Sequence, residues 1–231
     1  KIGFVENGAV DVVDVLMDIV GPSGDLLMPT SPNGLLQYDY VQNDEIFDVK
    51  DTPSALGSIT ENFRKREGVI RSLNYLEPVC AIGKNAQFLT EGHLGELTPY
   101  SKSSPFNRLT TVRGKILYLG VDLDNAGTSL HLLEDSVDFM FPVYSAEVFD
   151  VKIRDDKGKV HSVSTKVHNP VFSKKRKCNE LIPMFLEYGV CEKVWIGKAP
   201  SYLFDAKKML DLMILKYEEE KITMYTPKGQ L

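Results

Sequence analysis

The sequence predicts an α/β fold with a mixed sheet and one antiparallel ribbon. Segments with helical spacing of apolar residues alternate with short apolar runs that are typical of strands. Residues 146–154 and 159–167 alternate polar and apolar side chains around the tetrapeptide Asp-Asp-Lys-Gly, which is the signature of a hairpin. With 231 residues, a chain buries roughly 70% of its unfolded surface, so a substantial core is expected.

The first elements follow from apolar spacing and helix-ending residues. Residues 9–20 are predicted to form a helix, because apolar side chains recur at i, i+3 and i+4 before Gly21-Pro22. A short buried strand is predicted at 25–29. Residues 31–51 are polar, without clear periodicity, and that length predicts a functional loop.

A second helix is predicted to begin at Thr52, because a hydroxyl stands at the N-cap position and Pro53 at the first helical position. Gly68 is expected to end it. The following apolar runs predict two strands and the segments between them two short helices. The strands are 78–83 and 115–121, and the helices are 85–91 and 105–110.

The C-terminal part of the chain continues the alternation. A helix is predicted over 128–137, after which comes the hairpin. The last three predicted elements are a helix over 177–189, a strand over 191–197 and a long amphipathic helix over 201–220.

Composition excludes some partners and compartments. The net charge of −5 and the pI of about 5.5 argue against nucleic acid, which requires a basic face. No apolar run approaches the ~18 residues of a membrane span, and no signal peptide is visible. Three cysteines without a CxxC pair favour a reducing, cytoplasmic location.

Several common catalytic motifs are missing from the sequence. Without HxH, HExxH or CxxC spacing, His161 and His168 are interpreted as solvated surface residues, and no metal is expected. Cys80 lies within an apolar strand and is interpreted as an inert core residue. Neither a GxSxG elbow nor a Walker A loop is present.

Charged runs and helix starts leave alternatives open. The basic run 174–177 is either a phosphate site or, more simply, a solvated loop. Acidic residues of the long loop, among them Asp39 and Asp44, either solvate that loop or attract a polyamine. The starts "DTPS" and "SKSSPF" suit a phosphate or carboxylate, although each is also an ordinary helix cap.

His131 is the histidine whose surroundings most suggest chemistry. It lies in "DNAGTSLHLLED", so on a helix either Glu134 or Asp135 would lie beside the imidazole. A neighbouring carboxylate favours the imidazolium and fixes the tautomer, as a general base requires. The alternative is a partly buried histidine that serves packing.

Several blocks of sequence together resemble the aminoglycoside 3-N-acetyltransferase family. They occur in the family's order over nearly the whole chain, and the combination is far more specific than any one block. The blocks are "KIGFVENGAVDVVDVLMDIVGPSGDLLMPT", "FDVKDTPSALGSITENFRKREGVIRS", "TPYSKSSPFNRL", "LGVDLDNAGTSLHLLED" and "IGKAPSYLFDAKKMLD".

This resemblance implies a mixed, central sheet with flanking helices, and transfer of an acetyl group from acetyl-CoA to a sugar amine. His131 would be the catalytic histidine, oriented by Glu134. The resemblance further implies residues that bind acetyl-CoA and residues near the acceptor amine. The first group is Lys1, Ile2, Gly3, Thr52, Ser54, Arg71, Ser72, Ser103, Ser104 and Phe106. The second is the position of Asn74, to which the acidic loop residues Asp39 and Asp44 are added as candidates that would attract a polyamine.

The resemblance also bears on domain organisation. It predicts one acetyltransferase domain over 1–231, with a helix and a strand ahead of Lys1 in the complete protein. The expected partner is a small-molecule amine, with no nucleic acid, membrane or metal, and a homodimer is left open.

One stretch departs from the family's pattern. After Arg71-Ser72 many members carry His-Pro with a serine three residues beyond the proline, whereas this chain has Asn74, Tyr75 and Pro78 at those places. The acceptor therefore stays open between an aminoglycoside and another amino sugar. Two alternative functions are a non-catalytic relative that binds CoA or sugar, and an O-acyltransferase of surface polysaccharide synthesis.

Overall fold

The structure is a computed structural model that describes residues 2–34 and 36–229. Its contacts divide the chain into two compact units, each assembled from separate stretches of sequence. Unit 1 comprises the described residues of Lys1–Gly3, Phe106–Val143 and Pro170–Leu231. Unit 2 comprises the described residues of Phe4–Pro105 and Tyr144–Asn169.

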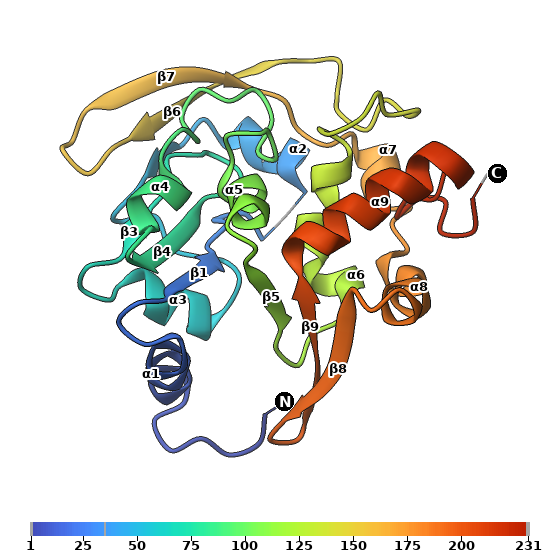
Figure 1. Ribbon diagram of the computed structural model, residues 1–231. Coiled ribbons are helices and arrows are strands. Elements are labelled where there is room, and N and C mark those ends of the chain that lie inside the picture. The colour runs from blue at the N-terminus through green and yellow to red at the C-terminus, as the bar shows by residue number, and fades with distance from the viewer. Residues whose placement is uncertain (1, 35, 230–231) are drawn as a thin grey trace. The chain divides into compact units, whose positions relative to one another are not determined.

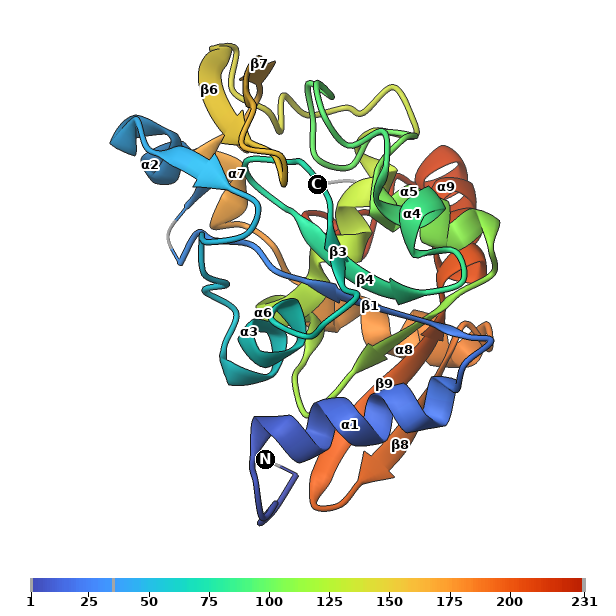
Figure 2. The ribbon, with the colours of Figure 1, turned by 90° about the vertical axis from the view of Figure 1, so that its left-hand side faces the viewer.

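An antiparallel sheet in the order β1-β4-β3 forms the centre of unit 2 (Figure 2). Its strands are β1 (Asp25–Pro29), β4 (Val79–Gly83) and β3 (Ile70–Arg71). Helices α1 (Ala9–Val20) and α3 (Ser58–Arg64) contribute Val13 and Phe63 to a buried cluster with Met28 and Cys80. The apolar faces of α1 and α3 therefore both cover this sheet.

A second sheet of unit 2 contains the predicted antiparallel ribbon. Strand β2 (Ile46–Asp48) pairs in parallel with β6 (Phe149–Arg154), which pairs antiparallel with β7 (Val160–Thr165). At the turn, Asp155 accepts hydrogen bonds from the backbone N–H groups of Lys157 and Lys159. Gly158 has φ 82°, a left-handed conformation that glycine adopts without strain.

Unit 1 contains the third sheet, in the order β5-β9-β8 (Figure 1). Its strands are β5 (Lys115–Tyr118), β9 (Ala199–Asp205) and β8 (Cys191–Ile196), all antiparallel. Phe204 of β9 is fully buried, and its ring centroid lies 5.3 Å from Tyr118 and 5.2 Å from Phe185. These edge-to-face contacts anchor the central strand of the sheet.

Helices complete both units. Unit 1 contains α6 (Leu123–Ala126), η2 (Gly127–Leu133), α7 (Pro170–Ser173), η3 (Cys178–Leu181), α8 (Ile182–Glu187) and α9 (Ala206–Glu220). Unit 2 contains α2 (Gln37–Tyr40), η1 (Val41–Asn43) and α4 (Ala86–Thr90). Helix α5 (Pro105–Thr111) belongs to unit 1 except for its first residue. Within residues 2–34 and 36–229, none of the helices has both the length and the apolar character needed to cross a bilayer.

The predicted α/β class with a mixed sheet and a ribbon is confirmed, and its strands are distributed over three small sheets. The predicted helix and strand at 9–20 and 25–29 are also confirmed. The expectation of one domain over 1–231 stays a prediction. Neither unit is continuous in the sequence.

Four element predictions were wrong in detail. Residues 31–51, predicted to form a loop, contain α2, η1 and strand β2. The helix expected from Thr52 begins only at Ser58, because the Thr52 hydroxyl accepts a hydrogen bond from the N–H of Asp48 and so closes the preceding turn instead. Residues 201–205 belong to strand β9 and not to the last helix. The segment 128–137 is helical only as far as Leu133, with 3₁₀ geometry that starts at Gly127.

Candidate active site

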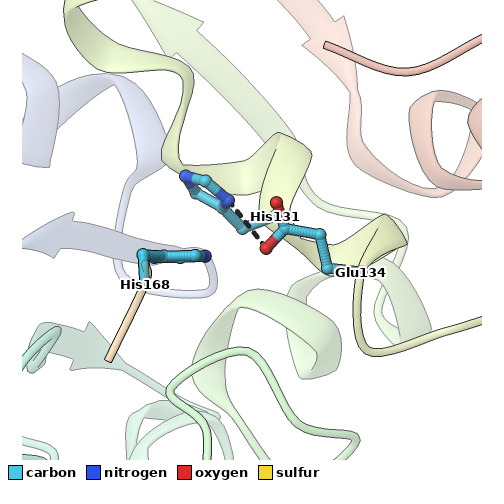
Figure 3. A group of neighbouring side chains, drawn as sticks. All are labelled: His131, Glu134 and His168. Atoms are coloured by element: carbon cyan, nitrogen blue, oxygen red, sulfur yellow. Dashed lines mark hydrogen bonds and ion pairs between the residues drawn. The ribbon is translucent and has the colours of Figure 1, made fainter. Parts of the chain in front are cut away.

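His131 and Glu134 form a buried hydrogen-bonded pair in unit 1 (Figure 3). The Nδ1 atom of His131 lies 3.0 Å from Oε2 of Glu134, and each residue is 5% exposed. The backbone N–H of Glu134 also donates to the carbonyl oxygen of His131. The 3₁₀ turn therefore places the two side chains on the same face of η2.

The sequence around His131 explains why this short helix is held firmly. Asp122 caps the preceding helix α6 by accepting a hydrogen bond from the N–H of Asn125. Gly127 packs closely against η3, since an added Cβ would lie 3.3 Å from Sγ of Cys178. Three leucines of η2 are fully buried, namely Leu130, Leu132 and Leu133. The imidazole is thus carried by a turn that the core of unit 1 immobilises.

The pairing determines how His131 can act. An ionised carboxylate only accepts hydrogen bonds, so Nδ1 of His131 must carry a proton. The neutral imidazole then has its lone pair on Nε2, the atom that can accept a proton from another molecule. In the protonated state the nearby carboxylate stabilises the imidazolium. This arrangement suits a general base.

A third residue of unit 1 extends this pair. The hydroxyl of Tyr225 donates a hydrogen bond of 2.6 Å to Oε1 of Glu134. Both side chains are buried. Sequence reasoning missed Tyr225, because it lies 91 residues from Glu134 and no motif marks it.

The cysteines offer no competing nucleophile. All three are buried and unlinked. Burial raises the pKa of Cys178 to about 12 and that of Cys191 to about 11, and it also raises the pKa of Cys80. A thiolate is the reactive form of cysteine, so these thiols are inert near neutral pH. The interpretation of Cys80 as a core residue is confirmed.

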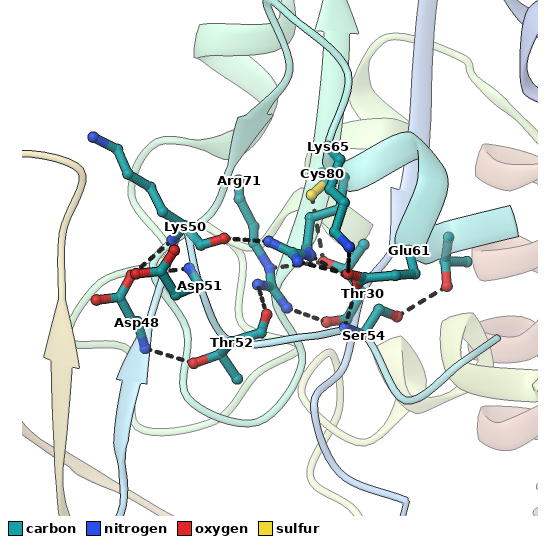
Figure 4. A network of polar contacts seen from close by, with 12 residues as sticks. Thr30, Asp48, Lys50, Asp51, Thr52, Ser54, Glu61, Lys65, Arg71 and Cys80 are labelled. Carbon is teal, nitrogen blue, oxygen red and sulfur yellow. Dashed lines mark hydrogen bonds and ion pairs between the residues drawn. The ribbon is translucent and has the colours of Figure 1, made fainter. Parts of the chain in front are cut away.

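Unit 2 holds a separate polar network centred on Arg71 (Figure 4). Arg71 is 7% exposed, and its guanidinium lies 4.7 Å from the ring centroid of Phe47. It donates to Oγ1 of Thr30 at 3.0 Å and to the carbonyl oxygen of Thr52 at 2.6 Å. Burial lowers the pKa of Arg71 to about 10, so the group stays charged at neutral pH. Arg71 therefore ties the loop at Thr52 to the end of strand β1.

The loop between β2 and α3 is held by further contacts of the same network. The backbone N–H of Ser54 donates to Glu61 at 2.8 Å, and its hydroxyl lies 2.9 Å from that of Thr60. Arg64 donates to Glu61 and to the carbonyl oxygen of Lys50. The hydroxyl of Ser54 is thus engaged in shaping the loop.

A cleft of about 770 Å³ lies in unit 2, beside this network. Its lining contains five cationic and two anionic side chains, which are Lys50, Arg64, Lys65, Arg71, Lys157, Glu91 and Asp156. This local surplus of positive charge contrasts with the net charge of −5 for the whole chain. Positive potential in a concave surface attracts anionic groups such as phosphates.

Ser72 and Asn74 both serve the turn that precedes β4. The hydroxyl of Ser72 accepts a hydrogen bond from the N–H of Val79 and lies 2.9 Å from Nδ1 of His93. Oδ1 of Asn74 accepts the N–H groups of Leu76 and Glu77 at 3.0 and 2.9 Å. Asn74 therefore forms an Asx-type turn, and its side-chain oxygen is occupied.

The remaining predicted binding residues are distributed over both units. Ser104 is buried directly before α5, whereas Ser103 is half-buried and Phe106 lies within that helix. The carbonyl oxygen of Ile2 accepts a hydrogen bond from the N–H of Lys198. Gly3 has φ 118°, and Lys1 lies outside the described residues.

The acidic candidates and the histidines differ in their exposure to solvent. Asp39 of α2 and Asp44 after η1 are both exposed. The prediction that His168 is solvated was wrong, because it is 3% exposed, stacks on Tyr144 at 4.9 Å and lies 3.1 Å from Oε1 of Gln37.

His161 was also predicted to be a solvated surface residue. The structure shows it half-buried instead. Its Nε2 atom pairs with Asp155 at 2.8 Å in the β6–β7 hairpin. The lysines of the basic run 174–177 are exposed, whereas Arg176 is half-buried. The exposure of these lysines favours the solvated loop over the phosphate site as the interpretation of this run.

The structure thus brings together His131 with Glu134 in one unit, and Arg71 with Thr52 in the other. The hydroxyls of Thr52, Ser54 and Ser72 are all engaged in local structure.

Comparison with known proteins gives a consistent result. The family described as aminoglycoside 3-N-acetyltransferase matches residues 1–218. Aminoglycoside N(3)-acetyltransferase VII of Streptomyces paromomycinus is 24% identical over 95% of this chain and 82% of its own length. Aminoglycoside N(3)-acetyltransferase IV of Salmonella sp is 34% identical over 56% of this chain and 46% of its own length.

Solved structures show the same fold. Aminoglycoside acetyltransferase AAC(3)-Xa superimposes with a TM-score of 0.80 at 24% identity, covering 94% of this chain and 83% of that one. AAC-IIIb in binary complex with CoASH gives a TM-score of 0.77 at 24% identity, covering 95% and 86%. AAC-VIa bound to sisomicin gives 0.75 at 24% identity, covering 94% and 87%.

Proposed function

Because the chain belongs to the aminoglycoside 3-N-acetyltransferase family, it is an acyltransferase, and we propose that it transfers an acetyl group from acetyl-CoA to an amine of an amino sugar or aminoglycoside. His131 acts as the general base and Glu134 orients it. The observation that carries this assignment is the buried contact of 3.0 Å between Nδ1 of His131 and Oε2 of Glu134.

The chemistry of the acceptor requires such a base. An alkylamine with a pKa near ~10 is mostly protonated at neutral pH, and the protonated nitrogen cannot attack a carbonyl. The ammonium first releases one proton to solvent, and Nε2 of His131 then accepts a second proton from the neutral amine nitrogen as the nitrogen–carbon bond forms. The carbon–sulfur bond of the thioester breaks, CoA leaves as a thiolate, and the proton held by His131 can then neutralise that thiolate. No covalent acetyl-enzyme is needed, which agrees with the buried and inert cysteines.

The co-substrate role rests on the family relationship and on the chemistry of unit 2. A relative of the same fold was solved with CoASH. The resemblance assigns the CoA arm to Thr52 and Ser54, and it places Arg71 close to the thioester end. Since their polar groups hold the 49–55 loop, we propose that these residues act by fixing its backbone for CoA. The cationic cleft beside Arg71 suits the phosphate groups of CoA.

The remaining assignments follow the same resemblance. Ser72, Ser103, Ser104 and Phe106, together with Ile2 and Gly3, are proposed CoA contacts. The developing oxyanion of the thioester requires preorganised donors, and backbone N–H groups near Ser104 are proposed for that role.

We propose a cationic acceptor. Relatives of the same fold were solved with sisomicin, a gentamicin and apramycin. Asp39 and Asp44 are exposed carboxylates that would attract a polyamine. Asn74 is proposed to act near the acceptor through the turn that it forms, because its oxygen already binds two backbone N–H groups. The cytoplasm is the proposed location, since all three cysteines are unlinked.

The proposal is tested by release of the CoA thiol in the presence of a panel of aminoglycosides and simple amino sugars. We expect turnover with at least one amine and a loss of roughly 100- to 10,000-fold in His131→Ala. His161→Ala is the matched control, because His161 also pairs with a carboxylate, at 2.8 Å, but within the hairpin. Full activity of His131→Ala would refute the assigned mechanism.

A further inference from the structure

We propose that Tyr225 is a positioning residue for the catalytic pair, fixing the carboxylate of Glu134 and setting how strongly it holds a proton on His131. This inference rests on the proposed function, because it assigns His131 as the base. It adds a member that neither the sequence motifs nor the family match provides, since that match ends at residue 218.

The contact itself is short and buried. The Tyr225 hydroxyl donates to Oε1 of Glu134 at 2.6 Å, while Oε2 of the same carboxylate faces Nδ1 of His131 at 3.0 Å. The side chain of Glu134 is fully buried, and Tyr225 is 8% exposed. A hydrogen bond to an ionised group in such surroundings is stronger than one in water. The Tyr225 hydroxyl therefore holds Oε1 of Glu134, while the imidazole of His131 holds Oε2.

The ring of Tyr225 is held by aromatic neighbours. Its centroid lies 6.1 Å from Phe139, 6.2 Å from Phe141 and 6.1 Å from Phe172, all in edge-to-face geometry. These residues all belong to unit 1. Edge-to-face packing restricts rotation of the phenol, so the hydroxyl has little freedom to leave Glu134.

The backbone at Tyr225 is equally restrained. The N–H groups of Tyr225 and Thr226 both donate to Oγ1 of Thr223, and the Thr226 hydroxyl donates to the carbonyl oxygen of Lys221. The N–H of Lys177 donates to the carbonyl oxygen of Met224. These hydrogen bonds restrain the turn that carries the phenol.

The charge around the contact favours a donor role. Burial, and then the Glu134 carboxylate, raise the pKa of Tyr225, so the phenol keeps its proton at working pH. Arg176 faces the same phenol and acts in the opposite direction. Cys178 also faces Glu134 and Asp124, but its thiol is protonated and adds no charge to the surroundings. Within unit 1, Tyr225 is thus a neutral donor to an anionic acceptor.

The sign of its effect follows from electrostatics. The phenol disperses negative charge from Glu134, so its removal leaves a buried carboxylate with one donor fewer. That carboxylate then favours the imidazolium more strongly. We expect Tyr225→Phe to raise the pKa of His131 by about 0.7 unit, the equivalent of one ordinary hydrogen bond.

The decisive measurement is the titration of His131 by nitrogen-15 NMR, with the resonance assigned by its loss in His131→Ala. Tyr217→Phe is the matched control. Tyr217 stacks on Phe139, and among the described residues its hydroxyl bonds to the backbone of Asp138 and Met140. It should lose stability without a change in the titration of His131.

A second variant tests the proposal should Tyr225→Phe fail to fold. Incorporation of 3-fluorotyrosine at position 225 retains the hydroxyl but makes it a stronger donor, so the pKa of His131 should fall. The acid limb of kcat/KM should move in the same direction as the NMR titration in each folded variant.

The outcomes separate the two proposals. An unchanged His131 titration in folded Tyr225→Phe, or in the fluorotyrosine protein, overturns the role of Tyr225. A shifted titration in a protein that acetylates no amine supports the coupling of Tyr225 to His131 and counts against the proposed function alone.

Discussion

Glu134 contacts His131 through one carboxylate oxygen, Oε2, at 3.0 Å, and it is three residues further along the same turn. The spacing allowed either Glu134 or Asp135 as the partner of His131. Glu134 makes the hydrogen bond that fixes the tautomer and the orientation of the imidazole. Because both side chains are buried, solvent screens their interaction weakly.

Glu134→Gln should lower kcat by up to roughly 10,000-fold, as when the carboxylate that orients the histidine of a serine-protease triad becomes an amide. It should also shift the acid limb of kcat/KM to lower pH by about one unit, because the imidazolium loses an adjacent anion. A pH series of thiol release measures both effects.

Asp135→Asn is the control for that experiment, since it removes the same charge one residue along the chain. We expect its pH profile to follow the unmodified protein. A larger shift in Asp135→Asn than in Glu134→Gln would show that the pairing has been assigned to the wrong acid.

Arg71→Met should lower the free energy of unfolding by about 3 kcal/mol, because the buried carbonyl oxygen of Thr30 and the partly buried one of Thr52 lose their donor. Urea unfolding provides the measurement. Arg154→Met is the comparison: Arg154 pairs with Asp48 at 3.1 Å but is 44% exposed, so its loss should cost under ~1 kcal/mol. Equal losses in the two variants would contradict the central role of Arg71.

Glu61 predicts a pH dependence of stability. Hydrogen bonds from Arg64, and further ones from Ser54 and Lys65, lower the pKa of Glu61 below its unfolded value of 4.5. Its contribution is thus fully present above pH 4.5 and is lost as the pH falls through the lower folded pKa. Glu61→Gln should destabilise the protein by about 1 kcal/mol at pH 7, and the difference from the unmodified chain should shrink below pH 4.5.

Denaturant unfolding at several pH values checks this. Glu67→Gln serves as the control, because it removes the same charge from an exposed position six residues further along the chain. A difference between Glu61→Gln and the unmodified protein that stays constant down to pH 3 would rule out the pKa as its source.

Two substitutions of Asn74 distinguish its role in forming the turn from a role in recognising the acceptor amine. Asn74→Ala should cost roughly 1–2 kcal/mol, because the N–H groups of Leu76 and Glu77 lose their acceptor. Asn74→Asp keeps an acceptor oxygen and should recover most of that stability. If Asn74 acts on the acceptor only through its turn, KM for the amine should be restored in Asn74→Asp together with stability; a KM still altered in that stable variant would point to direct contact.

Much of the fold could be predicted from local pattern. The stripe of α1 and the turn at Gly158 are contained within short stretches of sequence, so spacing alone identified them. His131 with Glu134 is likewise a local pair, three residues apart.

The roles of residues whose partners lie far away in the sequence could not be predicted from local pattern. The sequence suggests that Thr52 caps a helix, but its hydroxyl accepts from Asp48 and its carbonyl oxygen binds Arg71. Ser201–Asp205 continue a helical pattern, yet they lie between β5 and β8, and pairing on both edges overrides helix propensity. His168 was misjudged for the same reason, because Gln37, 131 residues away, supplies its partner.

The interleaving of the two units has a practical consequence for anyone who divides the gene. A cut after residue 105 would leave one polypeptide with β2 and the other with β6 and β7, although these strands form a single sheet. The parallel ladder between β2 and β6 would therefore be divided between the two fragments, while the ladder between β6 and β7 would stay in the second. Reconstitution by split-protein complementation would depend on the ribbon at 149–165 finding its partner strand on the other piece.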